Sequence, residues 1–329
     1  MKFGIGIPTC REGRDYPSNF GGPTEMAELS QIAEKLGIDY VWGDDHITPG
    51  EALLKKDVKP PSFFEVILSM SYVAAATKKI RLGIGVLVIV WRDPVLVAKQ
   101  IATLDVFSGG RVTLGVGIGG TRDEFESVFP RMKKARRGKV LDEQLEVLNL
   151  LFTKDNASYS GEYFAFEDLS FHPKPQQKQF PFYITAFAKD TPESLSRMAR
   201  WASLCAVNPT IESVRSRREG LQPYLEKLGK DISQVELTTL PTASVGRTHK
   251  EAVERLQRSR LFDRYKGQPV EKIEAANFIG TPAEITEKVK ALEKAGLGQC
   301  APQRFAANSY QELKEQVYMF GEEVVPNFK

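Results

Sequence analysis

The sequence predicts a (β/α)8 TIM barrel, an α/β fold in which eight parallel strands alternate with helices around a closed ring. Apolar β-branched runs alternate with amphipathic helical segments along the whole chain, and no other repeat is visible. A doubly wound open sheet is the alternative that this pattern leaves open. The chain has 329 residues, and α/β barrels of that length form one unit. We therefore expect a single domain over 1–329.

The stretch 80–120 carries the clearest strand, helix and strand unit. Residues 82–90 form a nearly continuous apolar run, which is typical of a strand covered on both faces. Asp93 is a suitable N-cap for the next helix, and Pro94 fits its first turn. Residues 111–117 form the second strand. Because a crossover helix joins parallel strands, both should end at one rim, where barrel enzymes carry their active sites.

The other predicted strands are shorter. They span 2–8, 40–42, 182–186, 204–207, 235–242 and 299–301. Helix-start signatures lie between them, with caps at Ser62, Thr121, Thr191, Thr248, Thr281 and Ser309. Two segments depart from the alternation. Residues 158–164 predict a hairpin around Gly161, and the charged, aperiodic segment 259–277 predicts an insertion or lid.

Composition narrows the function classes. The net charge is +3 with no basic stripe, which argues against a nucleic-acid partner. No apolar run approaches a membrane span, and the apolar start is too short for a signal peptide. Three cysteines far apart fit a reducing cytoplasm. Only three histidines are present, so we expect no multi-histidine metal site.

Asp45 and His46 form the sharpest chemical signal, because they follow the predicted strand 40–42 at the catalytic rim. Adjacent side chains at a strand end point to different sides and can flank a flat ring. An imidazole titrates near neutrality, so His46 is suited to proton transfer. The alternative interpretation is structural, with Asp45 capping the next loop and His46 packed in the core.

Glycine-rich and polar loops follow two further strands. Gly117, Gly119 and Gly120 do not have the spacing of a dinucleotide fingerprint, and the simpler interpretation is that bulky side chains here would block the approach of a ligand. Thr185 and Ala186 precede a helix N-terminus, a natural anion site. An ordinary loop with a threonine cap is the equal alternative.

Two residues at strand exits are candidates for the substrate side of the mouth. Cys10 follows the first strand and Trp91 follows the third. Burial in the core is the alternative for both, and we favour it for Cys10 because free cysteine often behaves as a small apolar residue.

Several motifs in order resemble the bacterial luciferase-like superfamily. They are GDDHITP, LGIGVLVIVWRDPVLVAKQIATLDVFSGGR, LGVGIGGTRDEF, HPKPQQ, FIGTPAEITEKVKALEKAGLG and EEVVP. The likeness covers nearly the whole chain, and it is greatest to the branch that uses the deazaflavin F-420 and to related FMN oxidoreductases. For the substrate it says almost nothing, since one barrel hosts many reactions.

The resemblance implies a barrel that binds its flavin at the C-terminal mouth, often as a homodimer. It implies a non-prolyl cis peptide under the flavin ring at Gly85-Val86. It also implies that His46 donates a proton or hydrogen bond at the reactive edge of the ring, while Asp45 contacts the cofactor. Asn208 matches a position near the cofactor in some relatives.

Two departures keep the function open. Gly120 stands where the similar F-420 sugar-phosphate dehydrogenases have a glutamate proton donor, and Thr185-Ala186 replaces a common Gly-Gly pair. The first hypothesis is hydride transfer between F-420 or FMN, with F-420 slightly preferred, and a small organic substrate near His46 and Trp91. An FMN-dependent monooxygenase, with 259–277 shielding the flavin, is the second. A catalytically silent flavin-binding barrel is the third.

Overall fold

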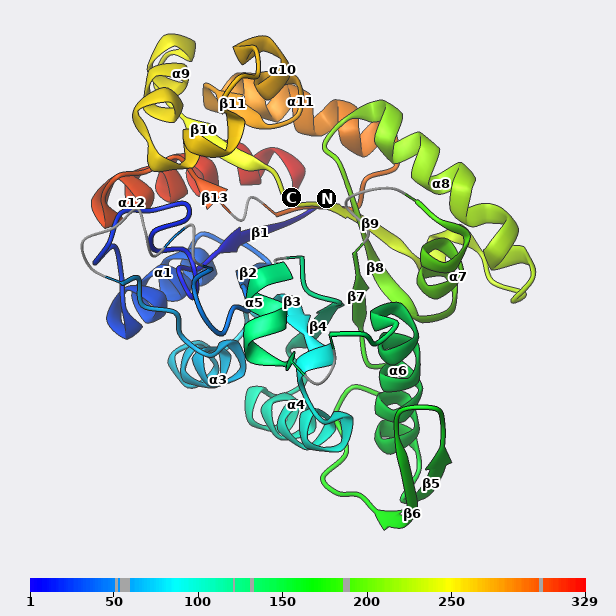
Figure 1. Cartoon of the computed structure of the whole chain (residues 1–329). Helices are drawn as coiled ribbons and strands as arrows, with labels where there is room; N and C mark the ends of the chain where they lie inside the picture. Colours follow the sequence, from blue (N-terminus) through cyan, green and yellow to red (C-terminus); the bar gives the residue numbers. More distant parts are fainter. Residues whose placement is uncertain (51–52, 54–59, 121, 131–132, 186–189, 302–303) are drawn as a thin grey trace.

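The computed structural model describes residues 1–50, 53, 60–120, 122–130, 133–185, 190–301 and 304–329. Within this part of the chain, eight parallel strands close into a barrel (Figure 1). In ring order they are β1 (Lys2–Gly6), β12 (Gln299–Cys300), β9 (Glu236–Thr239), β8 (Ala202–Val207), β7 (Phe182–Ile184), β4 (Val112–Gly117), β3 (Arg81–Val88) and β2 (Tyr40–Gly43). Because β1 pairs with both β2 and β12, the ring is closed. The predicted barrel is confirmed, and the open sheet is wrong.

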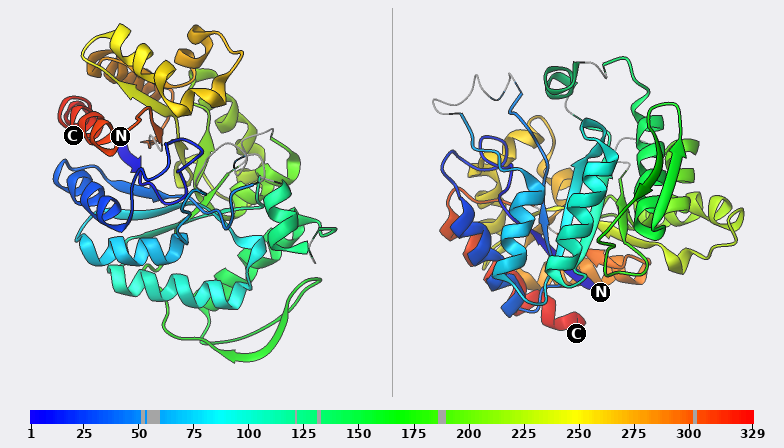
Figure 2. Two further views of the ribbon diagram at one scale, coloured as in Figure 1. Left: turned by 60° about the vertical axis from the view of Figure 1, so that its left-hand side comes forward. Right: turned by 90° about the horizontal axis from the view of Figure 1, so that it is seen from below.

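Helices cover the outside of the ring (Figures 1 and 2). The main ones are α1 (Pro23–Lys35), α3 (Val66–Ala76), α4 (Pro94–Ser108), α6 (Arg137–Thr153), α7 (Pro192–Trp201), α8 (Ile211–Glu226), α11 (Pro282–Lys294) and α12 (Tyr310–Met319). Several of their starts follow the predicted caps: the Asp93 carboxylate accepts the N–H groups of Val95 and Leu96, and Thr191 forms a capping box with Ser194. The predicted cap at Ser62 is wrong, because the N-cap of α3 is Glu65, whose carboxylate accepts the Leu68 N–H. No helix in the described ranges is long and apolar enough to cross a bilayer.

Aromatic side chains fill the barrel interior. Trp42 is fully buried there and stacks on Tyr40, with Tyr183 against its edge. Its indole requires glycine on the neighbouring strand, because a Cβ at Gly83 would lie 2.4 Å from the ring. The barrel centre is therefore a packed core, and ligands can bind only above it.

A bulge in β3 shapes the mouth. The β3–β4 register passes from Ile84 opposite Leu114 to Leu87 opposite Val116, so two residues of β3 face one residue of β4. These two residues are Gly85 and Val86, and the peptide bond between them is cis, as the resemblance implied.

The chain leaves the barrel twice. The predicted hairpin is confirmed: β5 (Asn156–Ser160) and β6 (Ala165–Ser170) pair antiparallel and extend away from the ring (Figure 2). The predicted single strand 235–242 is wrong. It is divided into β9 and β10 (Thr242–Val245), and Pro241 between them has no N–H to donate to a strand ladder.

Strand β10 belongs to a second sheet. In the described residues it pairs in parallel with β11 (Phe278–Gly280) and β13 (Arg304–Phe305). Helices α9 (His249–Arg258) and α10 (Val270–Ala275) lie beside this sheet (Figure 1). The segment 259–277 contains a 3-10 helix at Arg260–Tyr265 and α10. Its action as a lid, and the single domain over 1–329, stay predictions.

Candidate active site

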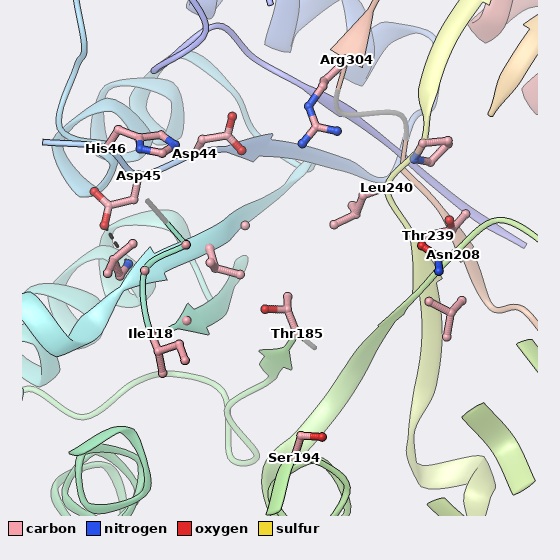
Figure 3. Close-up of a pocket in the computed structure, with 18 of the residues that line it drawn as sticks. Asp44, Asp45, His46, Ile118, Thr185, Ser194, Asn208, Thr239, Leu240 and Arg304 are labelled. Carbon is pink, nitrogen blue, oxygen red and sulfur yellow. Dashed lines mark hydrogen bonds between the residues drawn. The ribbon is translucent and has the colours of Figure 1, made fainter. Parts of the chain in front are cut away.

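A cavity of about 810 Å³ opens at the C-terminal ends of the barrel strands (Figure 3). Most of the site residues predicted from the sequence meet in its wall. They are Asp45, His46, Gly85, Val86, Gly117, Gly119, Gly120, Thr185 and Asn208. Ala186 lies outside the described residues. A volume of this size suits a ligand as large as a cofactor.

His46 is held by a buried carboxylate. Its Nδ1 lies 2.8 Å from Oε2 of Glu124, which is 2% exposed, and Oε1 of Glu124 accepts the Ile47 N–H at 2.8 Å. Because a carboxylate only accepts hydrogen bonds, we assign the ring proton to Nδ1. The Nε2 lone pair is then free to accept from Arg14 Nη1, which lies against it. The imidazole is thus oriented with Nδ1 toward Glu124 and Nε2 toward Arg14, which also lines the cavity.

Asp45 is tied to the end of β3. Its Oδ2 accepts the Val88 N–H at 2.8 Å and Arg92 Nη1 at 2.7 Å, while Oδ1 accepts Arg92 Nη2 at 2.9 Å. The side chain is buried, and this bidentate pair fixes the turn that follows the bulge. Asp45 therefore has a structural role, and its predicted contact with a cofactor stays a prediction.

The glycines at the rim differ in whether the surrounding structure requires them. A Cβ at Gly117 would lie 2.7 Å from Cγ2 of Val86, so the bulged strand requires glycine there. At Gly120, by contrast, a Cβ would meet no heavy atom of the described residues within 4 Å. The backbone at Gly120 therefore borders open space, and its contact with a flat ring stays a prediction.

Cys10 and Trp91 are both buried and are not among the residues that line the cavity. This corrects the place on the substrate side that was predicted for Trp91, whereas burial was the favoured interpretation for Cys10. Cys10 is 1% exposed, and its thiol lies 3.4 Å from the Asp44 carbonyl oxygen and 3.3 Å from that of Phe64. Burial raises the pKa of Cys10 to about 12, so the thiol stays protonated. Trp91 is buried under Gly119 and beside Phe125.

Three further polar residues of this region were missed from the sequence. Glu124 lies three residues after the predicted cap at Thr121, which is outside the described residues, and its carboxylate reaches His46. Arg14 belongs to a polar loop, and Arg304 to the short strand β13. Both line the cavity. No local pattern marks them, because their partners are distant in the sequence.

The first turn of α7 forms another part of the wall. Thr191 and Ser194 line the cavity, and Arg197 beside them binds Asp142 with its Nε at 2.6 Å from the carboxylate. A helix N-terminus carries a partial positive charge that favours an anion, although the Thr191 hydroxyl already accepts the Ser194 N–H here. This end of the cavity is suited to the phosphate of a cofactor.

Comparison with known proteins identifies the family. The family model described as luciferase-like monooxygenase matches residues 1–299. The chain belongs to the luciferase-like monooxygenase family. It is 24% identical to the FMNH(2)-dependent dimethylsulfone monooxygenase of Pseudomonas putida, over 91% of this chain and 86% of that protein. It is 28% identical to the F420-dependent glucose-6-phosphate dehydrogenase of Amycolatopsis mediterranei, over 71% and 68%.

Solved structures agree on the fold of this luciferase-like chain. The monooxygenase RslO1 of Streptomyces bottropensis superposes with a TM-score of 0.81 at 19% identity, and the match covers 100% of both chains. At that identity the likeness concerns the fold alone. The protein is an enzyme of the luciferase-like family, whose members among its relatives are named as oxidoreductases and monooxygenases.

Proposed function

We propose that this luciferase-like enzyme transfers a hydride between F-420 or FMN and a small organic substrate at the barrel mouth. The observation that carries the proposal is the meeting of an oriented imidazole, His46, with the bulged Gly85-Val86 pair and the open Gly120 in one cavity. Relatives named for F420 and for FMNH(2) both support a cofactor of this type. We slightly prefer F-420 over FMN, because the sequence motifs resemble the F-420 branch most.

The residues present fit such a cofactor. Val86, Ile118 and Leu240 supply an apolar wall, and the open space beside Gly120 would receive the flat ring. The α7 N-terminus at Thr191 would hold a phosphate group. When bound, the cofactor supplies the ring that gives or takes the hydride.

The protein's own contribution is a proton site at a fixed atom. Because Nδ1 of His46 is engaged by Glu124, only Nε2 can exchange a proton with a substrate in the cavity. Glu124 also stabilises the imidazolium that forms when Nε2 takes up a proton, as a carboxylate behind a catalytic histidine does. The barrel walls would hold the substrate in place, and Tyr265 and Asn277 of the predicted lid also line the cavity.

An FMN-dependent monooxygenase is the second candidate. It is favoured by the family description and by the named monooxygenases among the relatives. The third hypothesis, a catalytically silent carrier, receives less support because the oriented His46–Glu124 pair is intact.

Filling the space over Gly120 tests the cofactor site. Gly120→Trp is expected to weaken binding of FMN or F-420 by roughly 100-fold, since the indole would occupy the ring's place. Gly120→Ala is the matched control and should bind normally, because a Cβ there meets no neighbour. Dissociation constants come from absorbance titration. Turnover with and without oxygen then separates the hydride-transfer and monooxygenase candidates. If the wild type bound neither cofactor, the proposal would fall.

We also propose a homodimer that forms through α3 and α4. Large apolar side chains are exposed on these adjacent helices: Leu68 and Tyr72 on α3, and Leu96 and Phe107 on α4. Phe107 is 76% exposed. Within each helix the spacing places the pair on one face. Exposed apolar side chains gathered on neighbouring helices mark a candidate association site. The cytoplasmic location and the lack of a nucleic-acid partner stay predictions.

The double substitution Leu68→Glu with Phe107→Glu is expected to convert a wild-type dimer into a monomer, because it places charges in the apolar contact. Light scattering during size exclusion measures the mass. Ile211→Glu on α8, also an exposed apolar position, is the control and should stay dimeric. A monomeric wild type would contradict this proposal.

A further inference from the structure

One side of the cavity carries a cluster that the proposed chemistry does not use, which we name the arginine wall. It consists of Arg11, Arg14, Arg264 and Arg304 around Asp15 and Asp44. The loop after β1 supplies most of it, the predicted lid supplies Arg264, and β13 supplies Arg304. Ring closure between β1 and β12 brings these distant segments together.

The carboxylates do not balance the guanidinium groups. The fully buried Asp15 contacts Arg11 at 2.7 Å and Arg304 at 3.4 Å, and it also binds Arg264. Asp44 pairs with Arg11. No carboxylate of the described residues lies within ion-pair distance of Arg14. Four cations of the described wall thus share two anions, which leaves a surplus of two positive charges.

Burial and the surplus positive charge together lower the pKa of two of these arginines. Burial, followed by the repulsion of Arg11, lowers the pKa of Arg304 to about 10. Burial, followed by the repulsion of Arg264, also lowers the pKa of Arg14. Charged groups in this condition are stabilised by an added anion.

The two under-neutralised arginines face the cavity. Both Arg14 and Arg304 line it, and Figure 3 shows the Arg304 guanidinium projecting into the space between Asp44 and Leu240. No residue in the described ranges accepts a hydrogen bond from its Nη groups. The paired Nη groups of a planar guanidinium match the two oxygens of a carboxylate, sulfonate or phosphate.

The arginine wall lies apart from the place expected for the cofactor phosphate. In Figure 3 Ser194 of α7 and Arg304 lie at opposite ends of the residues drawn, and His46 lies on the side of the wall. Arg14 joins the wall to the chemistry, because its Nη1 lies against Nε2 of His46. A ligand held by Arg14 and Arg304 would therefore be placed beside the proton site.

We infer that the substrate of this enzyme carries an oxyanion group that Arg304 and Arg14 hold beside His46. The inference rests on the proposed function, since it names the substrate class of the same cavity. An oxyanion is a stronger acceptor for Arg14 than a neutral imidazole. Its arrival draws the guanidinium away from Nε2 and leaves that lone pair free for the reacting proton.

Paired probes of equal shape test this inference. Benzoate is compared with benzamide, and methanesulfonate with dimethyl sulfone, by calorimetric titration of the wild type with and without bound cofactor. Each anion should bind roughly 10- to 100-fold more tightly than its neutral partner. Arg304→Gln should remove most of that preference, and Arg304→Lys should keep part of it, since lysine keeps the charge but loses the fork.

Controls separate this inference from the proposed function. Arg247→Gln changes an exposed arginine paired with Glu323, and it should leave the preference unchanged. Arg304→Gln should also keep wild-type affinity for FMN or F-420. Equal binding of acid and amide by the wild type would overturn the inference, as would a preference that survives in folded Arg304→Gln. A wild type that binds no cofactor would contradict the proposed function. The ratio of the affinities for benzoate and benzamide would still decide whether the arginine wall binds an oxyanion.

Discussion

Replacing His46 with alanine is expected to lower turnover by roughly 10²- to 10⁴-fold, the range that a positioned proton donor or acceptor contributes. Nε2 is the ring atom that faces the cavity wall, and Nδ1 is occupied by Glu124, so no other atom of the ring can replace it. Cofactor binding should remain, because the proposed phosphate contact lies at the far α7 end of the cavity.

Two companion variants sharpen this test. Glu124→Gln keeps the side-chain size but removes the charge behind Nδ1, so the expected loss is smaller than that of His46→Ala and falls mainly on kcat. His172→Ala is the control, because that histidine is exposed and lies 3.8 Å from its nearest carboxylate, Asp155. Steady-state rates and cofactor dissociation constants are measured together. Wild-type turnover in His46→Ala with cofactor bound would remove the proton role.

Arg92→Met is expected to lower the free energy of unfolding by about 3–5 kcal/mol, the usual cost of removing one partner of a buried ion pair. The Asp45 carboxylate is fully buried and receives both Nη groups of Arg92, so methionine leaves it with the Val88 N–H as its remaining partner. The turn after β3 should loosen as a consequence.

A double-mutant cycle checks whether the pair is responsible. Asp45→Asn removes the buried charge and keeps an acceptor for Val88, so adding it to Arg92→Met should recover part of the loss. Arg136→Met is the exposed control, and its pair with Glu162 should be worth at most about 1 kcal/mol. Urea unfolding with a constant m-value gives the free energies. A loss below about 1 kcal/mol in Arg92→Met would mean that the pair is not essential to this turn.

Local sequence determined the barrel itself. The apolar run before Asp93 and the cap it provides define a strand and a helix within a few residues, and such signals need no distant partner. The rim position of His46 followed from the same reasoning, because every parallel strand of a barrel ends on one side. The cis bond at Gly85-Val86 was reached only through resemblance, since nothing in the two residues themselves requires it.

Tertiary structure alone decided which side chains meet. Glu124 contacts His46 from 78 residues away, and Arg264 reaches Asp15 across 249. The same closure buried Cys10 away from the cavity. Strand and cap patterns depend on neighbours in the chain, whereas ion pairs and cavity walls depend on how the ring closes. The sequence thus determined the fold and the rim of the barrel that carries His46. Packing across the closed ring decided which charged side chains surround the cavity at that rim.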